Sequence, residues 1–364
     1  MKKKFKEAEL NELKSKLKLG WSKVVGREEG FEETWKVVED ASRYSFNASH
    51  SLSYAYDSLY GAYLKSHYPL EYYSVVLNQY SGDTERTNKL TDELLEFNIT
   101  INPPKFRYSK AKYHPDKETN SIFKGIGSIK YLNEQVGEEL YKLRNNKYNN
   151  FVELLKELDS TSINSRQLEI LIKLNFFEEF GKTKYLLDIV EIYNKLNGKK
   201  QFKKDNLPLG LTEDIVREYS NKETEKMFTQ VDTDKLITTI TLNIPNIDIS
   251  IRDIFEAELE YVGHISYIDK SYTDRVCAIT EIKENKWGTV FCTLYRLNNG
   301  KSMTLKIDKK YFSNKPLEKY DVINVGTIDE KFKRRKVEGK WVITDDKEYI
   351  LSSYGRVLDD GNTN

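Results

Sequence analysis

The sequence predicts an α+β protein of several domains, helical in its N-terminal half and ending in a β-barrel. Three observations predict this fold class. Apolar residues recur at helical spacing over residues 5–97 and again over 125–181, which is typical of helices with one buried face. From residue 275 the pattern changes to alternation and short apolar runs, which favours strands. The 364 residues exceed one typical domain and suffice for more than one hydrophobic core.

Composition restricts the class of protein. The 58 basic and 57 acidic residues leave a formal charge of +1, which excludes a globally basic nucleic-acid binder but permits local basic patches. The two cysteines, Cys277 and Cys292, lie in apolar runs, so we interpret both as buried residues of a protein from a reducing compartment. No apolar run of about 18 residues occurs, and the lysine-rich start lacks the core of a signal peptide. These features predict a cytoplasmic protein.

The N-terminal region predicts helices at 5–20, 30–43, 51–66, 69–80 and 83–97. The third helix has an apolar stripe at i, i+3, i+4 and i+7 spacing, so one of its faces is expected to be buried. The stripe consists of Leu52, Ala55, Tyr56, Leu59, Ala62 and Tyr63. Pro69 is expected to start the fourth helix, because its missing N–H costs nothing there. Asp83 is the expected cap of the fifth helix and Asn98 its expected stop.

A polar cluster precedes the third helix. Asn47, Ser49 and His50 lie at its start, and Ser49 or Ser51 is expected to cap it. A helix N-terminus has free N–H groups and partial positive charge, so the cluster suits an anion such as a phosphate. A structural role for His50, bridging helix ends, is the alternative.

Four motifs follow one another along the chain. They are Phe46-Asn47-Ala48-Ser49-His50-Ser51, Ala62-Tyr63-Leu64-Lys65-Ser66-His67-Tyr68-Pro69, Gly125-Ile126-Gly127-Ser128-Ile129-Lys130, and the segment 164–181 with its apolar positions. In this order and at this spacing they resemble the bacterial C-family replicative polymerase, the DNA polymerase III alpha subunit. The resemblance covers residues 30–181 and continues weakly to the end of the chain. Four ordered motifs make it specific, whereas any one alone would be weak.

The resemblance implies a domain order. We expect a fingers-like helical domain at 1–104, a helix-hairpin-helix-like module at 105–200, a linker or crossing segment at 201–268, an OB-fold domain at 269–352 and a flexible tail at 353–364. The expected architecture is therefore helical fingers and a helix-hairpin-helix-like region followed by an OB-type β-barrel.

In the family the fingers motif grips the incoming nucleotide. The resemblance therefore implies a nucleotide-binding set, with Arg43 and Lys65 as nearby cations. The set is Arg43, Asn47, Ser49, His50 and Lys65. The family has a lysine where this chain has Ala48, so one phosphate-binding charge is missing.

Catalytic groups are not expected on this chain. The family's metal-binding carboxylates lie in a palm domain upstream of the fingers motif, where they hold two metal ions. The aspartates near the motif fit helix caps or solvated positions, and the four histidines and two cysteines have no metal-ligand spacing. We expect no catalytic residue, metal ligand or cofactor here, and Mg²⁺ in the palm of a partner chain.

The segment 125–181 resembles the family's tandem helix-hairpin-helix module, which grips duplex DNA through hairpin amides. The family has glycines just after the positions of Ile129 and Lys130, whereas this chain has Tyr131-Leu132-Asn133. A hairpin without glycine cannot easily bring its backbone against a phosphate. Two interpretations stay open: a hairpin that still contacts DNA, and a unit retained for packing.

The segment before the β domain is polar. Residues 199–204 form a charge run that we interpret as a solvated linker, and Met227-Phe228 is the apolar pair of residues 222–236. In the family this region has the peptide that docks into the sliding clamp through two apolar side chains, with a glutamine three residues earlier. Thr224 occupies that position here. Clamp binding through Met227 and Phe228, and an ordinary linker anchor, both remain open.

The C-terminal region predicts strands at 275–282, 289–297, 301–307, 322–328 and 340–343, with a short helix within 309–320. Asn298-Asn299-Gly300 is typical of a hairpin turn. Five strands with that helical interruption fit an OB barrel, and the family has one at this place.

A basic patch near the end of the chain is the strongest candidate for contact with single-stranded DNA. A run of lysines and arginines there contains one phenylalanine and is followed by a tryptophan. The cations supply charge for the nucleic-acid backbone, and the aromatic rings supply a flat face for a base. The expected DNA-binding residues are Lys331, Phe332, Lys333, Arg334, Arg335, Lys336 and Trp341. Phe291 and Tyr295 add stacking surface if they face outward. A solvated hairpin tip is the alternative.

These expectations combine into three hypotheses. In the first, the chain is a subunit of a split DNA polymerase from a phage or mobile element, contacting nucleotide and DNA beside a palm-bearing chain. It would then be a nucleotidyltransferase component that does not polymerise alone, with single-stranded and duplex DNA and a sliding clamp as partners. In the second it is a non-enzymatic DNA-binding accessory factor. In the third it is an interaction protein that mimics the polymerase.

Overall fold

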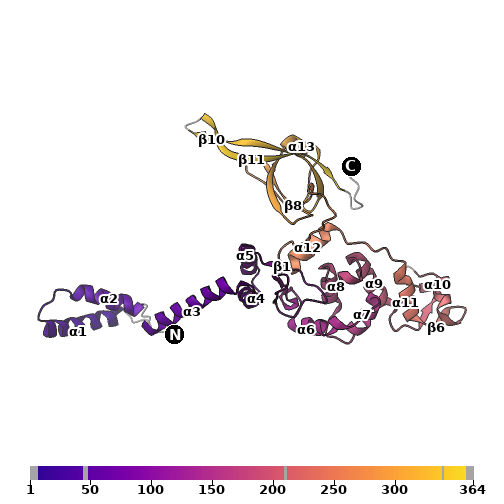
Figure 1. Ribbon diagram of the computed structural model, residues 1–364, viewed down its shortest axis with the longest axis horizontal. Helices are drawn as coiled ribbons and strands as arrows, with labels where there is room; N and C mark the ends of the chain where they lie inside the picture. The colour runs from indigo at the N-terminus through magenta and orange to yellow at the C-terminus, as the bar shows by residue number, and fades with distance from the viewer. Residues whose placement is uncertain (1–6, 44–47, 209–210, 338–339, 358–364) are drawn as a thin grey trace. The chain divides into compact units, whose positions relative to one another are not determined.

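The computed structural model describes residues 7–43, 48–208, 211–337 and 340–357. The chain divides into two compact units, Met1–Pro69 and Leu70–Asn364. Their elements are labelled along the chain in Figure 1. Within the described residues, no helix is both long and apolar enough to cross a membrane.

The first unit contains three helices, α1 (Glu7–Val25), α2 (Phe31–Arg43) and α3 (Ala48–His67). Helices α1 and α2 pair around the ring of Phe31, which is buried and lies edge-on to Trp21 at a centroid distance of 6.1 Å. Gly26 and Gly30 adopt positive φ angles of 73° and 84° in the turn between them, a conformation that glycine adopts without steric cost. All three helices lie where the periodicity predicts them.

Helix α3 corrects one expectation. Its apolar stripe is not buried: Leu59 is 60% exposed, and Leu52, Tyr56 and Tyr63 are also exposed. The spacing predicted the helix correctly, but among the described residues of the first unit no other element covers this face. Periodicity reports which side chains share a face and says nothing of what packs on it.

The second unit opens with a small α/β layer. Its elements are α4 (Pro69–Gln79), α5 (Thr84–Leu94), η1 (Leu95–Phe97), β1 (Thr100–Asn102), β2 (His114–Asp116) and β3 (Ser121–Phe123), with strand order β1-β3-β2. Helix α4 begins at Pro69, as predicted. Asp83 caps α5 by accepting a hydrogen bond from the Arg86 N–H at 3.1 Å, and Asn98 ends η1 in the left-handed conformation. These three local predictions are confirmed.

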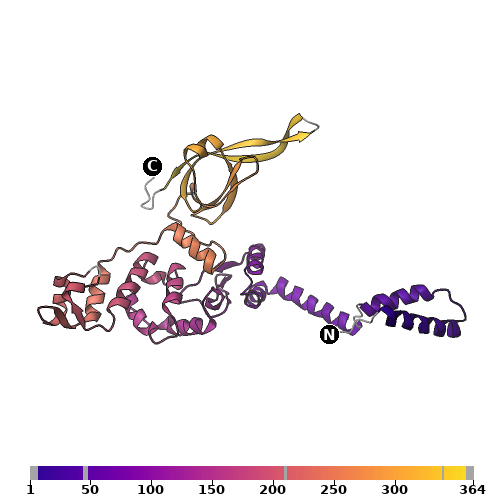
Figure 2. The ribbon, with the colours of Figure 1, turned by 180° about the vertical axis from the view of Figure 1, so that it is seen from behind.

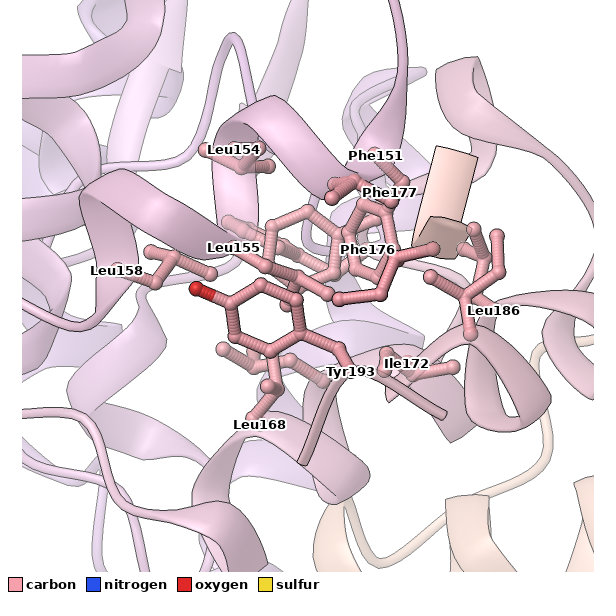
Figure 3. Packing of buried hydrophobic residues seen from close by; sticks show 14 of the residues in the cluster. Phe151, Leu154, Leu155, Leu158, Leu168, Ile172, Phe176, Phe177, Leu186 and Tyr193 are labelled. Atoms are coloured by element: carbon pink, nitrogen blue, oxygen red, sulfur yellow. The ribbon is translucent and has the colours of Figure 1, made fainter. Parts of the chain in front are cut away.

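A helical module forms the largest core. It consists of η2 (Ile126–Ser128), α6 (Glu134–Lys142), η3 (Leu143–Asn145), α7 (Phe151–Leu158), α8 (Ser165–Lys173), η4 (Glu178–Phe180) and α9 (Thr183–Leu196). Figure 3 shows side chains from α7, α8 and α9 around Phe176 and Phe177, whose rings meet edge-on at 4.8 Å. Asn164 and Gln167 form a reciprocal capping box at the start of α8, a strong start signal.

The segment expected to be a linker is folded. It contains β4 (Gln201–Lys203), η5 (Lys204–Asn206), α10 (Glu213–Glu218), β5 (Ser220–Glu223), β6 (Met227–Val231), α11 (Thr233–Leu242) and α12 (Ile251–Tyr261). The strands form a sheet of order β4-β6-β5. Phe202, in the middle of the charge run, is buried opposite Phe228. The prediction of a solvated linker was wrong because single apolar residues between lysines anchor these strands.

The C-terminal region is a closed five-stranded barrel. Its elements are β7 (Val276–Glu284), β8 (Val290–Arg296), β9 (Ser302–Ile307), α13 (Lys309–Asn314), β10 (Val322–Val337) and β11 (Lys340–Arg356), with strand order β7-β8-β9-β11-β10. The helix between the third and fourth strands was predicted. Leu305 and Ile307 face the core and Thr304 faces outward.

The last two strands are longer than predicted. They continue past the barrel as a two-stranded arm, which Figure 2 shows clearly. Their pairing extends from Ile323 opposite Arg356 to Val337 opposite Lys340, with bulges that shift the register. The sequence of the arm alternates charge with isolated apolar residues, so its pattern resembles a loop more than a strand.

Helix α12 connects the helical part of the second unit to the barrel. Phe255 is fully buried and lies edge-on to Tyr295 of β8, at a centroid distance of 5.4 Å. The Tyr295 hydroxyl donates to the carbonyl of Tyr267 at 2.9 Å. Tyr295 is therefore a core residue, which corrects its assignment as a stacking surface for bases.

Candidate nucleic-acid interface

The expected nucleotide-binding set is only partly described. Asn47 lies outside the described residues, as do the side chains of Arg43 and Ala48. Ser49 and His50 are exposed in the first turn of α3, where the His50 ring lies edge-on to Tyr54 at 4.5 Å. Helix α3 begins at Ala48, so Ser49 and Ser51 lie inside the helix instead of capping it.

Lys65 lies at the other end of the same helix. A rise of about 1.5 Å per residue separates it from His50 by about 22 Å. Helix α3 therefore does not bring Lys65 beside Ser49 and His50, which corrects the expectation of one compact site. At this end the His67 ring stacks on Tyr63 at a centroid distance of 4.1 Å, and its Nδ1 lies 2.8 Å from the Ser66 hydroxyl.

The first hairpin of the helical module keeps its shape without glycine. Tyr131 adopts a left-handed φ of 71°, a conformation that costs most residues about 1–2 kcal/mol. Its exposed ring lies 3.8 Å from the Arg166 guanidinium carbon and 4.9 Å from the Lys130 ammonium nitrogen. These cation–π contacts offset part of the strain. Asn133 caps α6 by accepting a hydrogen bond from the Val136 N–H at 2.9 Å.

Two backbone N–H groups of this hairpin donate hydrogen bonds within the protein, and two others have no acceptor among the described residues. The Lys130 N–H donates to the carbonyl of Tyr261 at 3.0 Å, and the Leu132 N–H to that of Ile129. Within the described part of the chain, the N–H groups of Tyr131 and Asn133 have no hydrogen-bond partner. The hairpin thus retains two donors for an anion despite the missing glycines.

The basic patch lies on the arm formed by β10 and β11. Lys331, Phe332 and Lys333 are exposed there, and Phe332 is 53% exposed. Lys347, opposite Phe332 in the ladder, pairs with Glu330 at 2.6 Å. The backbone of Arg334, Arg335, Lys336 and Trp341 belongs to the arm, but their side chains lie outside the described residues.

A row of side chains crosses the outer face of the barrel. Phe291 of β8 pairs with Lys283 of β7 on one side and with Lys306 of β9 on the other. Directly opposite residues of antiparallel strands share a face, so the ring lies between two lysines. Both lysines also have carboxylate partners, Glu281 at 2.6 Å and Glu348 at 3.7 Å. Such exposed pairs are weak, so a phosphate can compete for the lysines.

The turn between β7 and β8 contains a candidate that the sequence reasoning missed. Trp287 is 75% exposed, and the Lys286 ammonium nitrogen lies 4.6 Å from its ring centroid. An exposed tryptophan beside a lysine matches the requirements for stacking on a base. The signal was present in the sequence as Lys286-Trp287-Gly288 between two apolar runs.

The expected clamp-binding pair lies in a folded strand. Phe228 is fully buried in β6, with the Lys204 ammonium nitrogen 5.1 Å from its ring centroid. Met227 is half-buried, and its N–H donates to the Thr224 hydroxyl at 3.1 Å. Of the two open interpretations, the burial of Phe228 supports an apolar anchor, because a groove on another protein cannot bury a side chain that already lies in this core.

The cysteines are structural, as predicted. Burial raises the pKa of the Cys277 thiol to about 11 and that of Cys292 to about 12, so both stay protonated at neutral pH. No group of three or more histidine, cysteine, aspartate or glutamate side chains within the described ranges is arranged to hold a metal ion.

Comparison with known proteins supports the resemblance found in the sequence. Residues 98–187 match the model of the helix-hairpin-helix motif, a range that contains strands β1 to β3 and the helical module as far as the start of α9. The chain is 32% identical over 164 residues to DNA polymerase III subunit alpha from Campylobacter jejuni subsp. jejuni serotype O:2, covering 44% of this chain and 14% of that protein.

Two further relatives have the same name. DNA polymerase III subunit alpha from Aquifex aeolicus is 34% identical over 160 residues, or 43% of this chain and 13% of the relative. The Escherichia coli K12 protein is 31% identical over 147 residues, or 40% of this chain and 13% of the relative. The chain thus aligns with only about a seventh of these relatives, and is similar in that segment to the alpha subunit.

Proposed function

We propose that this chain is a DNA-binding replication protein that contacts single-stranded DNA through its barrel and duplex DNA through its helical module. One observation supports this most directly: two hairpins of the barrel expose an aromatic ring beside lysines. These are Trp287 with Lys286, and Phe332 with its cross-strand partner Lys347, while Lys331 and Lys333 flank Phe332 along the strand. Stacking of a base on such a ring contributes about 1–3 kcal/mol, and the lysines neutralise the phosphates.

The outer face of the barrel fits the same role. Phe291, on the second strand, lies between Lys283 of the first strand and Lys306 of the third. The second and third strands and the adjoining loops are the surface that OB-type barrels use for oligonucleotides. The helical module adds the open N–H groups of Tyr131 and Asn133. Backbone N–H groups position a protein on a phosphate backbone without reading sequence.

The similarity to alpha subunits supports a role in DNA replication. In the more specific form of this proposal the chain is a subunit of a split polymerase, and a palm-bearing chain supplies the carboxylates and Mg²⁺. In that complex α3 would present Ser49 and His50 to the nucleotide. Clamp docking through Met227 and Phe228 does not enter this proposal, since it would require β6 to leave its sheet.

Single-strand binding is tested by fluorescence anisotropy with a labelled dT20 oligonucleotide. The variant Lys331→Ala, Phe332→Ala, Lys333→Ala is expected to bind at least tenfold more weakly, and each lost phosphate contact flattens the salt dependence by a slope of about 0.7. Trp287→Ala is expected to weaken binding without changing that slope. The matched control is Lys184→Ala with Lys195→Ala, which removes two lysines from α9. Equal binding by all variants would refute the assignment to the barrel.

The split-polymerase form is tested by primer extension. The purified chain is expected to give no synthesis alone, and to restore or raise synthesis when a palm-bearing chain from the same genome is added. His50→Ala should then reduce incorporation more than His67→Ala, because His67 lies at the far end of α3. A chain that binds the oligonucleotide but never affects synthesis would instead be the accessory factor.

A further inference from the structure

A cavity of about 690 Å³ lies beneath the hairpin of the helical module. Its walls come from the start of α5, the segment that follows β3, the hairpin and the end of α12. The residues that decide its chemistry are Ser81, Thr84, Lys124, Lys130, Tyr131 and Glu260. Cavities of this volume accommodate small ligands.

The walls are held by specific contacts. The Lys130 N–H donates to the Tyr261 carbonyl at 3.0 Å, which ties the hairpin to the end of α12. Gly263 follows with a φ of 90°, and a Cβ at this position would lie 2.4 Å from Cγ2 of Thr84. Only glycine allows α12 to approach α5 this closely. The cavity is therefore a fixed feature of the second unit.

A buried lysine lines the cavity. Lys124 is only 6% exposed, and its ammonium group donates to the Tyr113 hydroxyl at 3.1 Å. No carboxylate within the described ranges forms an ion pair with it. A buried ammonium costs several kcal/mol unless a counter-charge or several hydrogen bonds compensate. One phenol leaves this cation under-compensated, which points to an anion that occupies the cavity.

The other polar groups that line the cavity also suit an anion, both in their charge and in the hydrogen bonds that they can donate. Lys130 is exposed and has no ion pair among the described residues, while the one lining carboxylate, Glu260, is exposed to solvent. The hydroxyls of Ser81 and Thr84 make no hydrogen bond within the described part of the chain and can donate to a bound group. Two unpaired lysines thus face one solvated carboxylate.

His264 shows how strongly this region disfavours additional positive charge. Burial lowers the pKa of His264 to about 4, and the nearby Lys124 ammonium acts in the same direction, while Asp92 opposes it. Its Nδ1 is buried and has no hydrogen-bond partner among the residues that the structure describes. The imidazole is therefore neutral at pH 7 and does not satisfy the charge of Lys124.

We infer that this cavity binds a phosphate group, held by Lys124 and Lys130 with the hydroxyls of Ser81 and Thr84. The Lys130 N–H is already bonded to the Tyr261 carbonyl of α12, so Lys130 can reach the phosphate only through its side chain. The phosphate belongs either to a free nucleotide or to a DNA strand that passes the hairpin. In its DNA form the inference rests on the duplex contact of the proposed function, whereas the single-strand contacts of that function lie on the barrel and are tested separately.

The test compares the full chain with Lys124→Met and Lys130→Met, and with Lys117→Met as a control that removes an exposed lysine paired to Glu71. Calorimetric titrations use inorganic pyrophosphate and dATP, and anisotropy uses a labelled 20-base-pair duplex. Loss of a charge-assisted hydrogen bond lowers affinity by about tenfold or more. We expect this loss in both cavity variants and none in the control.

Each outcome is decisive. Weaker binding of pyrophosphate and dATP assigns the site to a free nucleotide, whereas weaker binding of the duplex alone assigns it to a DNA backbone. Unchanged binding of all three probes by both variants, or no binding of any probe by the unmodified chain, would overturn the inference. If Lys124→Met does not fold, Lys130→Met decides alone, since its side chain is exposed. The dT20 titration of the barrel variants is independent of this result.

Discussion

Helix α3 and the helical module both have apolar side chains at helical spacing, but these side chains are exposed in α3 and buried in the module. In α3 the aromatic and aliphatic side chains at helical spacing are exposed, with Tyr60 at 62%. In the module the side chains around Phe176 and Phe177 are fully buried, as Figure 3 shows. The two regions differ in how many other elements pack against the apolar face. Helices α7, α8 and α9 surround the two rings, whereas no described element of the first unit packs on the apolar face of α3. An apolar face stabilises a fold only when another element covers it.

The largest expected effect on stability comes from a substitution in the buried core of the helical module. Phe177→Ala removes a fully buried ring from the module and should lower the free energy of unfolding by about 3–5 kcal/mol, because a cavity remains. Chemical denaturation followed by circular dichroism measures the change. A loss below about 1 kcal/mol would mean that the module is not close-packed around this residue.

A second prediction concerns pH and the buried His264. Its pKa is about 4 in the folded protein because of burial and Lys124, and about 6.5 in the unfolded chain. Below pH 6.5 the unfolded state binds a proton that the folded state does not, so stability falls as the pH drops toward 4, by up to about 3 kcal/mol. Urea unfolding at several pH values measures this, and His264→Gln should remove that part of the pH dependence. An identical pH profile in the variant would contradict the prediction.

Tyr131 gives a smaller effect that separates strain from packing. Tyr131→Gly relieves a left-handed conformation and loses the contacts with Arg166 and Lys130, so the two changes should cancel to within about 1 kcal/mol. Tyr131→Val keeps the strain, adds β-branching and loses the contacts, so it should destabilise by about 1–3 kcal/mol. Thermal unfolding of both variants checks the order. The same stability for Gly and Val would show that the backbone at this position relaxes.

The smallest effect on stability is expected for a substitution on the exposed surface of α3. Tyr60→Ala should change the stability of the isolated chain by no more than about 0.5 kcal/mol, because the ring is solvent-exposed. The measurement is the same denaturation experiment as for Phe177. A loss comparable to that of Phe177→Ala would show that α3 packs against another part of the protein in solution and would break the comparison.

Much of the fold was readable in the sequence because its causes are local. The caps at Asp83 and Asn98, the start of α4 at Pro69 and the turn at Gly300 each follow from one side chain acting on its own backbone. The barrel was also predicted, with its helix between the third and fourth strands. The linker was not, since Phe202 and Phe228 make strands only by meeting each other across a sheet.

The candidate site, like the fold, contains residues that the sequence predicted and residues that it did not. The residues of the basic patch were found by composition, and the resemblance to the polymerase subunit by ordered motifs. Trp287 was missed because a lone exposed tryptophan has no periodic signal. Lys124 was missed as well, because its burial depends on contacts that join β3, α5 and α12.

The sequence by itself determined the helices, the strand pattern and the family resemblance, since spacing and capping act within a few residues. Only the tertiary structure decided which apolar faces are covered, that Phe228 and Tyr295 are core residues, and that a lysine is buried beside a cavity. Those outcomes depend on long-range packing, in which residues far apart in the chain exclude water from one another.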